Sequence, residues 1–416
     1  MKVLWFTNNA VSLNTKELSG GWMQSLEQAL TALNDIQLFI ATKAKNGRPG
    51  RSVVGKTVYY SISDPRTKIQ KRMDLTFNRE PNEYFLNRYL SVIRDVKPDI
   101  IQIFGTEMDY GLICENTDVP VVIHTQGILQ VIYHFLQTHA PSFLEKIKTN
   151  NINNLILGST IGNGLRIMAK RCEIESRILK ACRNVMGRTA WDKRVLSILA
   201  PNAQYFHCDE MLRSEFFLHN WVYPQSEILV ISSTISNPAY KGHDNIISTC
   251  RALKNAGINF IWNVIGIDEQ SDAYRLFYRK QHSDLLKHIL FHGNIDAKTM
   301  INYLLHSNIY VHPSHIENSS NALCEAMALG MPVIALDVGG NVSMVHDHFE
   351  GLIAPDNDPY SLAGLIKYLS ENSDFSTYLG KNAKTRARLR HNPELIIAQI
   401  KSIYYEIIQK HEVSKR

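Results

Sequence analysis

The feature that most constrains this chain is the stretch from His312 to Gly340, which reads HPSHIENSSNALCEAMALGMPVIALDVGG. A buried strand ends at His312, a polar loop follows, a helix spans about residues 321–329, and a second strand runs over 332–336. This order of elements predicts a β-α-β unit, which implies a parallel sheet.

The loop of this stretch has the composition of a helix start that binds anions. Two glutamates, Glu317 and Glu325, stand eight residues apart across it. The residues between them that supply N-cap side chains and free backbone N–H groups are Asn318, Ser319, Ser320 and Asn321. Because a helix N-terminus carries partial positive charge, we expect it to hold a phosphorylated ligand.

Length and composition are those of an ordinary globular chain with more than one domain. At 416 residues the chain exceeds what one hydrophobic core usually organises, so we expect two domains. Basic residues number 45 and acidic residues 39, and this mild excess of +6 does not predict nucleic-acid binding. Local basic clusters would still favour an anionic membrane surface.

Cysteine usage and hydropathy indicate a cytoplasmic protein. The six cysteines are scattered and no pair has the spacing of zinc ligands, so we expect reduced thiols. A strand-like run follows Met1 at once, where a secretory signal would have a charged leader and a long apolar segment. No window approaches the roughly 20 apolar residues of a membrane span, so any membrane contact would be peripheral.

The N-terminal half begins with the elements of a Rossmann-like unit. A strand at 2–7, the pair Gly20-Gly21, a helix at 22–33 and a strand at 36–41 follow in order. Glycines at such a turn let a phosphate approach the backbone, although paired glycines also serve as plain turns.

Two more residues of this half lie at predicted strand ends, where the ligands of doubly wound sheets bind. His124 closes a strand at 120–124, and Arg188 follows a short strand at 184–187. A histidine at a strand end is equally consistent with a hydrogen-bonded structural residue.

Basic segments at 43–51, 66–79 and 141–182 admit two interpretations. They could be solvent-exposed loops and a helix that faces the core with its basic side in solvent. They could equally form a surface that binds the acceptor or a membrane, because both give the same sequence pattern. Residues 218–226 lack periodicity and contain Pro224, which predicts an interdomain linker.

Beyond this linker the alternation restarts, and Lys241-Gly242 lies between its first strand and its first helix. We therefore predict an α/β protein with two Rossmann-like domains whose parallel sheets face each other across a cleft. The domains are expected at 1–220 and 221–393, with a C-terminal helix at 394–416 packing back on the first.

Glu317, Glu325 and Lys241 together fit the parts of a nucleotide-sugar. Carboxylates accept hydrogen bonds from the ribose diol and the sugar hydroxyls, and a lysine neutralises a departing diphosphate. Two glutamates at this spacing are usually solvated surface charges, but here the flanks at 309–311 and 326–336 are strongly apolar.

The stretch from Glu317 to Gly340 resembles the Glu-x7-Glu signature of retaining B-type glycosyltransferases of family four, the glycosyl transferases group 1. The residues from Lys241 to Asp244 resemble that family's Lys-Gly motif, and Gly20-Gly21 resembles its first glycine loop. Residues 228–357 carry most of the resemblance, which implies the B-type fold and a nucleotide-sugar donor.

The resemblance implies a role for each residue. Glu325 would bind the ribose hydroxyls, Glu317 the hydroxyls of the donor sugar, and Lys241 the diphosphate. His124 would lie near the primary hydroxyl of the sugar or near the acceptor. The remaining donor-binding positions would be Gly20, Gly21, Asn318, Ser319, Ser320, Asn321, Gly339 and Gly340. Members of the family bind no metal at the diphosphate, so none is expected.

Two departures from the family pattern concern the phosphates. Residues 231–235 contain no arginine before the lysine, and Asn318-Ser319-Ser320 stands where Gly-Phe-Gly is common. We hypothesise that Arg188 supplies the missing positive charge across the cleft.

The expected activity is transfer of a hexose from a UDP- or GDP-linked donor to a hydroxyl of a glycan or lipid-linked acceptor. The transfer would retain the anomeric configuration, need no cofactor or metal, and serve cell-surface polysaccharide biosynthesis. The expected site is cytoplasmic, with peripheral contact to the inner face of an anionic membrane as an open alternative, and no nucleic acid is expected as a partner. Two other functions stay open, a nucleotide-sugar 2-epimerase of the same architecture and a non-catalytic nucleotide-sugar-binding subunit.

Overall fold

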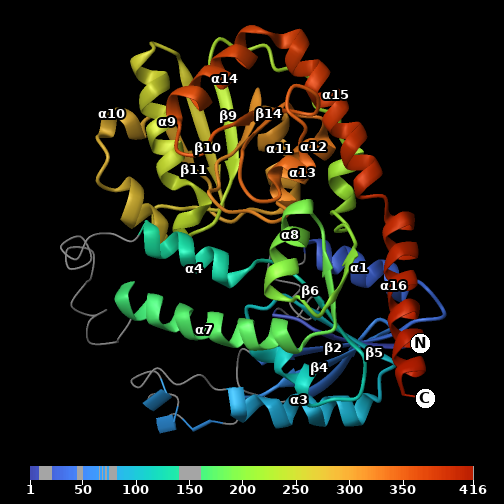
Figure 1. Ribbon diagram of the computed structural model, residues 1–416. Coiled ribbons are helices and arrows are strands. Elements are labelled where there is room, and N and C mark those ends of the chain that lie inside the picture. The colour runs from blue at the N-terminus through green and yellow to red at the C-terminus, as the bar shows by residue number, and fades with distance from the viewer. Residues whose placement is uncertain are drawn as a thin grey trace. The chain divides into compact units, whose positions relative to one another are not determined.

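The structure is a computed structural model that describes residues 1–8, 21–44, 50–64, 66–67, 69–70, 73–74, 82–139 and 161–415 (Figure 1). Its contacts divide the chain into two compact units. Unit 1 comprises Met1–Arg188, Asp192–Cys208 and Pro393–Arg416, and unit 2 comprises Thr189–Trp191 and Asp209–Asn392.

Unit 1 is built on a mostly parallel sheet. Among the described residues its strands follow the order β3-β4-β2-β1-β5-β6-β7-β8, and the pair β3 and β4 is antiparallel. The strands are β1 (Lys2–Phe6), β2 (Gln37–Lys43), β3 (Gly50–Val54), β4 (Thr57–Ile62), β5 (Ile100–Phe104), β6 (Val121–His124), β7 (Asn184–Gly187) and β8 (Gln204–His207). The antiparallel pair arises because Gly55, at a φ of 59°, turns the chain inside a run that the sequence pattern reads as one strand.

Helices lie on both faces of this sheet because its central strand β1 is apolar and buried from Val3 to Phe6. Successive side chains of a strand point to opposite faces. Trp5 of β1 donates its indole N–H to Tyr404 of α16 at 3.2 Å, whereas the neighbouring Phe6 packs edge-on against Tyr89 of α3. The helical segments of unit 1 are α1 (Gly21–Thr31), α3 (Asn82–Val96), η1 (Asp109–Glu115), α4 (Leu129–Thr138), α7 (Ile161–Ala181), α8 (Ala190–Leu199) and α16 (Pro393–Ser414).

Unit 2 has an all-parallel sheet in the order β11-β10-β9-β12-β13-β14 within the described part of the chain. The strands are β9 (Leu229–Thr234), β10 (Phe260–Ile265), β11 (Ile289–Phe291), β12 (Ile309–His312), β13 (Val333–Leu336) and β14 (Leu352–Ala354). Strands buried on both faces read as continuous apolar runs, and this explains why β12 and β13 are easily recognised in the sequence.

Two apolar layers cover the two faces of the unit 2 sheet. One cluster joins the sheet to α9 and α14, and the other joins it to α11, α12 and α15. The helical segments are η2 (Ser214–Leu218), η3 (Ala239–Lys241), α9 (His243–Asn255), η4 (Tyr274–Tyr278), α10 (Ser283–Leu286), α11 (Ala297–Leu305), α12 (Asn321–Leu329), α13 (Asn341–Met344), α14 (Pro359–Glu371) and α15 (Ser373–Arg390). The predicted α/β class with two parallel-sheet domains is confirmed.

The segment 218–226, expected as a linker, lies inside unit 2. Trp221 is 7% exposed and donates its indole N–H to the Ser307 carbonyl at 2.7 Å. Its backbone N–H donates to the carbonyl of Leu329, the last residue of α12. The crossing from unit 1 to unit 2 therefore falls at residues 208–209 instead of 220–221, because burial of this tryptophan binds the segment to the second core.

The basic helix α7 buries an apolar side in the core of unit 1. Ile178 and Leu179 are 1% exposed, while Arg177 is exposed and binds Glu115 of η1. The core-facing interpretation therefore accounts for the apolar side of this helix. Across the described residues, no helix combines the length and apolar character needed to cross a membrane.

Candidate functional site in unit 2

The loop between β12 and α12 presents a capped helix start, as the sequence indicates. The Ser320 hydroxyl accepts the Leu323 N–H at 3.3 Å, which satisfies one of the N–H groups that a helix start leaves open. Gly330 ends the helix at a φ of 89°, a conformation that favours glycine. The apolar side chains from Leu323 to Leu329 are buried, so the helix is fixed in the core while its N-terminus meets the loop.

Glu317 lies in this loop and is held by two basic side chains. Lys241 Nζ is 2.7 Å from Glu317 Oε2, and His312 Nε2 is 3.3 Å from the same oxygen. Burial by itself would raise the pKa of Glu317, but Lys241 and His312 outweigh it and lower the pKa to about 2. Glu317 is therefore an ionised hydrogen-bond acceptor throughout the physiological pH range.

Lys241 reaches Glu317 because a glycine follows it. Gly242 has a φ of 80°, and a Cβ placed there would lie 1.8 Å from the carbonyl oxygen of Pro313. Only glycine permits this approach of the α9 start to the β12–α12 loop. Burial opposes the charged form of Lys241, yet the neighbouring Glu317 raises its pKa above the ordinary value, so the ammonium keeps its charge.

Gly339 and Gly340 serve the same loop from the other side. A Cβ on Gly339 would lie 1.9 Å from the Glu317 carbonyl oxygen, and one on Gly340 would lie 1.7 Å from the Asn318 carbonyl oxygen. Gly340 N–H also donates to the Glu317 carbonyl at 3.0 Å. Within unit 2, the Asn318 side-chain oxygen accepts the Thr189 hydroxyl at 2.9 Å. These contacts fix the backbone that carries Glu317.

Glu325, one turn into α12, is engaged by a residue that the sequence reasoning did not identify. Arg213 donates Nε–H to Oε1 and an Nη2 hydrogen to Oε2, both at 2.8 Å. Burial raises the pKa of Glu325, and Arg213 offsets part of that rise. Arg213 stands just before η2 and outside every motif that the sequence offers, so no pattern in the sequence points to it.

A buried imidazolium joins the loop to two other segments of unit 2. His315 lies 2.9 Å from Asp244 of α9 through Nε2 and 2.8 Å from Asp356 through Nδ1. Burial would lower the pKa of His315, but the two carboxylates raise it to about 9. Asp356 and Asp358 have an Asp-x-Asp spacing, yet Asp356 binds His315 and Asp358 caps α14 by accepting the Ser361 N–H.

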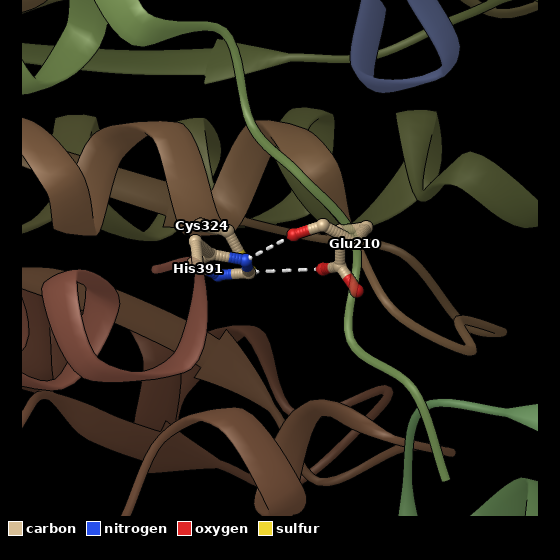
Figure 2. A group of neighbouring side chains, drawn as sticks. All are labelled: Glu210, Cys324 and His391. Carbon is tan, nitrogen blue, oxygen red and sulfur yellow. Dashed lines mark hydrogen bonds between the residues drawn. The ribbon is translucent and has the colours of Figure 1, made fainter. Parts of the chain in front are cut away.

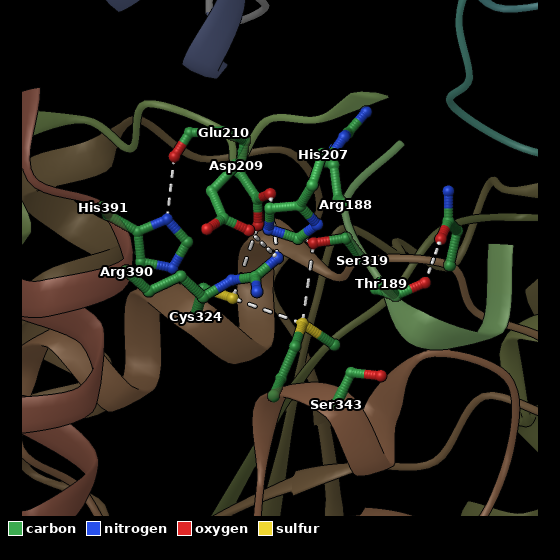
Figure 3. Close-up of polar contacts among 12 residues, drawn as sticks. Arg188, Thr189, His207, Asp209, Glu210, Ser319, Cys324, Ser343, Arg390 and His391 are labelled. Atoms are coloured by element: carbon green, nitrogen blue, oxygen red, sulfur yellow. Dashed lines mark hydrogen bonds and ion pairs between the residues drawn. The ribbon is translucent and has the colours of Figure 1, made fainter. Parts of the chain in front are cut away.

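A second polar network seats Ser319 at the start of α12. Its hydroxyl donates to Glu210 Oε1 at 2.6 Å, and His391 Nδ1 donates to the Glu210 carbonyl at 2.8 Å. Arg390 lies 2.7 Å from Asp209 and 3.5 Å from Glu210, so one guanidinium contacts both carboxylates (Figure 3).

The same network contains the group of described residues whose ligand atoms come within 4.8 Å of one another, namely Glu210, Cys324 and His391 (Figure 2). Such a set matches the ligand types of zinc. Arg390 already supplies positive charge to Glu210, and the Cys324 thiol, whose pKa burial raises, contacts the Glu210 carboxylate at 3.6 Å. These contacts form a polar network that ties residues 209–210, at the start of the long segment of unit 2, to α12 and α15.

The predicted residues of unit 1 gather at the carboxyl ends of its strands. His124 ends β6 with Nδ1 at 3.1 Å from the Gln102 amide, and its ring packs edge-on against Trp22. Arg188 follows β7, and its guanidinium carbon lies 4.6 Å from the centre of a Trp22 ring. Gly21 begins α1, whereas Gly20 lies outside the described residues. Trp22, which no sequence argument singled out, is the residue that His124 and Arg188 share.

Known proteins resemble this chain most in unit 2. Residues 222–386 match the family described as glycosyl transferases group 1. Over 177 residues the chain is 25% identical to the capsular polysaccharide biosynthesis glycosyltransferase CapM of Staphylococcus aureus, a match that covers 41% of this chain and 44% of CapM. The chain thus aligns with less than half the length of that relative.

Solved structures extend the likeness to both units. Sucrose-phosphate synthase of Thermosynechococcus elongatus superposes with a TM-score of 0.75 at 17% identity, covering 98% of this chain and 99% of that one. HepE of Anabaena, in complex with UDP and glucose, gives a TM-score of 0.66 at 13% identity, with 98% and 100% covered. At such identities the likeness establishes the fold. The chain therefore has the fold of B-type glycosyltransferases, and within it residues 222–386 match the family of glycosyl transferases group 1.

Proposed function

We propose that this chain is a retaining glycosyltransferase that moves a hexose from a UDP- or GDP-linked donor to a hydroxyl of a glycan or lipid-linked acceptor. The observation that carries the proposal is the cluster around the start of α12, where Glu317, Lys241 and Glu325 lie on segments fixed by glycine contacts and ion pairs. The name of CapM and the UDP and glucose bound to HepE support a nucleotide-sugar donor and a role in cell-surface polysaccharide biosynthesis.

Each charged group has a part in this proposal. Lys241 exchanges its contact with Glu317 for the diphosphate, whose negative charge grows as the bond to the sugar breaks. Glu317, ionised because its pKa is about 2, accepts hydrogen bonds from the sugar hydroxyls and does not serve as a proton store. Glu325 accepts hydrogen bonds from the ribose hydroxyls, and the N–H groups at the start of α12 face the phosphates.

Transfer then occurs on one face of the sugar. The acceptor oxygen forms the new bond to the anomeric carbon as the diphosphate leaves, and a phosphate oxygen takes the acceptor proton. No protein general base is required, and we propose that no metal ion is needed because Lys241 and the helix start carry the leaving-group charge. Full turnover in EDTA, unchanged by added magnesium, is the expected result.

The experiment that tests the function combines a binding screen with a turnover assay. UDP- and GDP-sugars are screened by thermal shift, since a ligand that binds only the folded state raises the melting temperature. Release of UDP or GDP from the stabilising donor is then measured with and without glycan and lipid-linked acceptors. Release that depends on an acceptor supports the transferase, and anomeric NMR of the product reports retention.

The same assay separates the alternatives. Isomerised donor in the absence of acceptor identifies a 2-epimerase, and nucleotide binding without any release identifies a non-catalytic subunit. Arg188 is proposed to supply the phosphate charge missing from the family pattern. Unchanged donor affinity and turnover in Arg188→Ala would contradict that role.

Membrane contact is part of the proposal for a lipid-linked acceptor. The exposed basic residues of α7, such as Arg177, support a peripheral contact of a cytoplasmic enzyme with anionic lipid. Flotation with vesicles of phosphatidylglycerol and phosphatidylcholine is expected to recover the chain with the anionic vesicles. Absence of the protein from the floating fraction would count against a membrane-bound acceptor.

A further inference from the structure

The bidentate contact between Arg213 and Glu325 points to a function for a residue outside the matched family region, which begins at residue 222. Arg213 lies before η2 and Glu325 lies in α12, so the contact joins segments 112 positions apart. Planar two-point pairing of a guanidinium with a carboxylate fixes both the position and the rotation of the carboxylate.

We propose that Arg213 is a positioning residue of the nucleotide site, which orients Glu325 to accept hydrogen bonds from the two ribose hydroxyls. The inference rests on the proposed function, because it deepens the role given there to Glu325. Arg213 itself is not proposed to touch the ligand.

The geometry leaves Glu325 able to accept further hydrogen bonds. A carboxylate has about four lone-pair sites, and the two contacts from Arg213 occupy one on each oxygen. The remaining sites are available to a pair of adjacent hydroxyls. A diol therefore adds to the ion pair and does not have to displace it.

The hold on Arg213 comes from its own neighbours. Its guanidinium carbon lies 4.7 Å from the centre of the Phe216 ring, and the Phe216 side chain is fully buried. The Arg213 side chain is 21% exposed and that of Glu325 is 7% exposed, so water screens the pair weakly. The guanidinium is thus held by the aromatic ring on one side and the carboxylate on the other.

The charge of Glu325 depends on Arg213. Burial raises the pKa of Glu325, the Arg213 contacts lower it, and Glu215 raises it again. The buried phenol of Tyr310 in β12 also faces this charge: burial raises the pKa of Tyr310, and the negative charge of Glu325 raises it further. Removing Arg213 leaves only influences that raise the pKa, so a protonated Glu325 would lose part of its capacity to accept from a diol.

The test measures binding of UDP and 2′-deoxy-UDP by calorimetry, or of the guanosine pair if the wild type binds GDP instead. We expect Arg213→Ala to weaken UDP binding about tenfold at pH 7 and to weaken 2′-deoxy-UDP binding much less, because the deoxy ligand cannot use both hydroxyl contacts. The ratio of variant to wild-type Kd for UDP, measured from pH 6.5 to 8.5, is expected to fall as pH rises, because loss of Arg213 shifts the pKa of Glu325 upward.

Two further variants keep the test decisive. Arg213→Lys retains a charge but not the two-point contact, so it is expected to weaken UDP binding without the pH dependence. Arg275→Ala removes an arginine from an exposed ion pair with Asp272 in the same unit and is expected to leave binding unchanged. Melting curves show which variants are folded, and Arg213→Lys carries the test if Arg213→Ala does not fold.

The outcomes separate this inference from the proposed function. If the wild type binds neither nucleotide, the proposed function fails. If the wild type binds UDP but the Arg213 variants weaken UDP and 2′-deoxy-UDP by the same factor at every pH, only the positioning role of Arg213 is overturned.

Discussion

The polar residues of unit 2 and those of unit 1 are held in place by different interactions. In unit 2, Glu317, Glu325 and His315 each have an oppositely charged partner within 3 Å, and glycines bring their loops together. In unit 1, His124 and Arg188 pack against the ring of Trp22, and their side chains hydrogen-bond to uncharged groups, the Gln102 amide and the Thr125 carbonyl. Charge pairs of this kind fix the direction of a side chain, whereas an aromatic face tolerates lateral movement. In terms of the proposed function, we infer that unit 2 provides a preformed donor site and that unit 1 adapts to the acceptor.

The largest expected effect is at Glu317. Glu317→Ala removes an ionised acceptor from the proposed sugar site and is expected to lower kcat by about 100-fold or more, the usual cost of losing one preorganised contact. Glu371→Ala, at an exposed position of α14, is the matched control and should retain activity. Steady-state kinetics and a melting curve are sufficient, and full turnover by a folded Glu317→Ala would remove the basis of the proposed function.

The next effect concerns Gly340, one of the glycines that pack against the loop that carries Glu317 in unit 2. Gly340→Ala would force a Cβ against the Asn318 carbonyl, so we expect a loss of about 1–3 kcal/mol of unfolding free energy. Gly364→Ala, in α14 with open space around it, is expected to stabilise by about 0.5–1 kcal/mol. Denaturant unfolding measures both, and equal effects of the two substitutions would contradict the proposed close packing.

A pH-dependent effect should appear in unit 2 through His315. Its folded pKa of about 9 exceeds the unfolded value near 6.5, so its contribution of up to about 3 kcal/mol is fully present below pH 6.5 and is lost as pH rises through 9. His315→Asn is therefore expected to lower the melting temperature at pH 6 and much less at pH 9.5. His282→Asn, at an exposed position, is the control. If the melting temperature of His315→Asn falls further below that of the wild type as pH rises, a raised pKa of His315 is contradicted.

The smallest effect is expected at the surface of unit 1. Arg177→Ala breaks an ion pair whose arginine is 61% exposed, and such pairs contribute less than about 1 kcal/mol. Thermal unfolding at low and high salt should show a change near the detection limit. A loss comparable to that of Gly340→Ala would mean that α7 depends on this contact.

The two units also differ in how much could be predicted. In unit 2 the strands on either side of the site, β12 and β13, are mostly apolar, and the capping and glycine residues between and after them mark the helix and its loops. The order of elements around Glu317 and Glu325 therefore follows from the sequence. Arg213 could not be predicted, because its pairing with Glu325 spans 112 positions and depends on tertiary packing. Trp221 was misleading for the same reason, since a segment without periodicity can still be fixed by one buried aromatic side chain.

The return of α16 to unit 1 has a consequence for the folding of this chain during its synthesis on the ribosome. Tyr404 of this helix bonds to Trp5 and Gln102, both wholly buried in the first sheet, and Gln399 donates to the His207 carbonyl. A ribosome therefore delivers the last helix of unit 1 only after all of unit 2 has been made. We infer that the nascent first sheet waits without α16 while residues 209–392 are synthesised. Trp5 and Gln102 then lack the cover of Tyr404, so this chain has a particular need for chaperone protection at that stage.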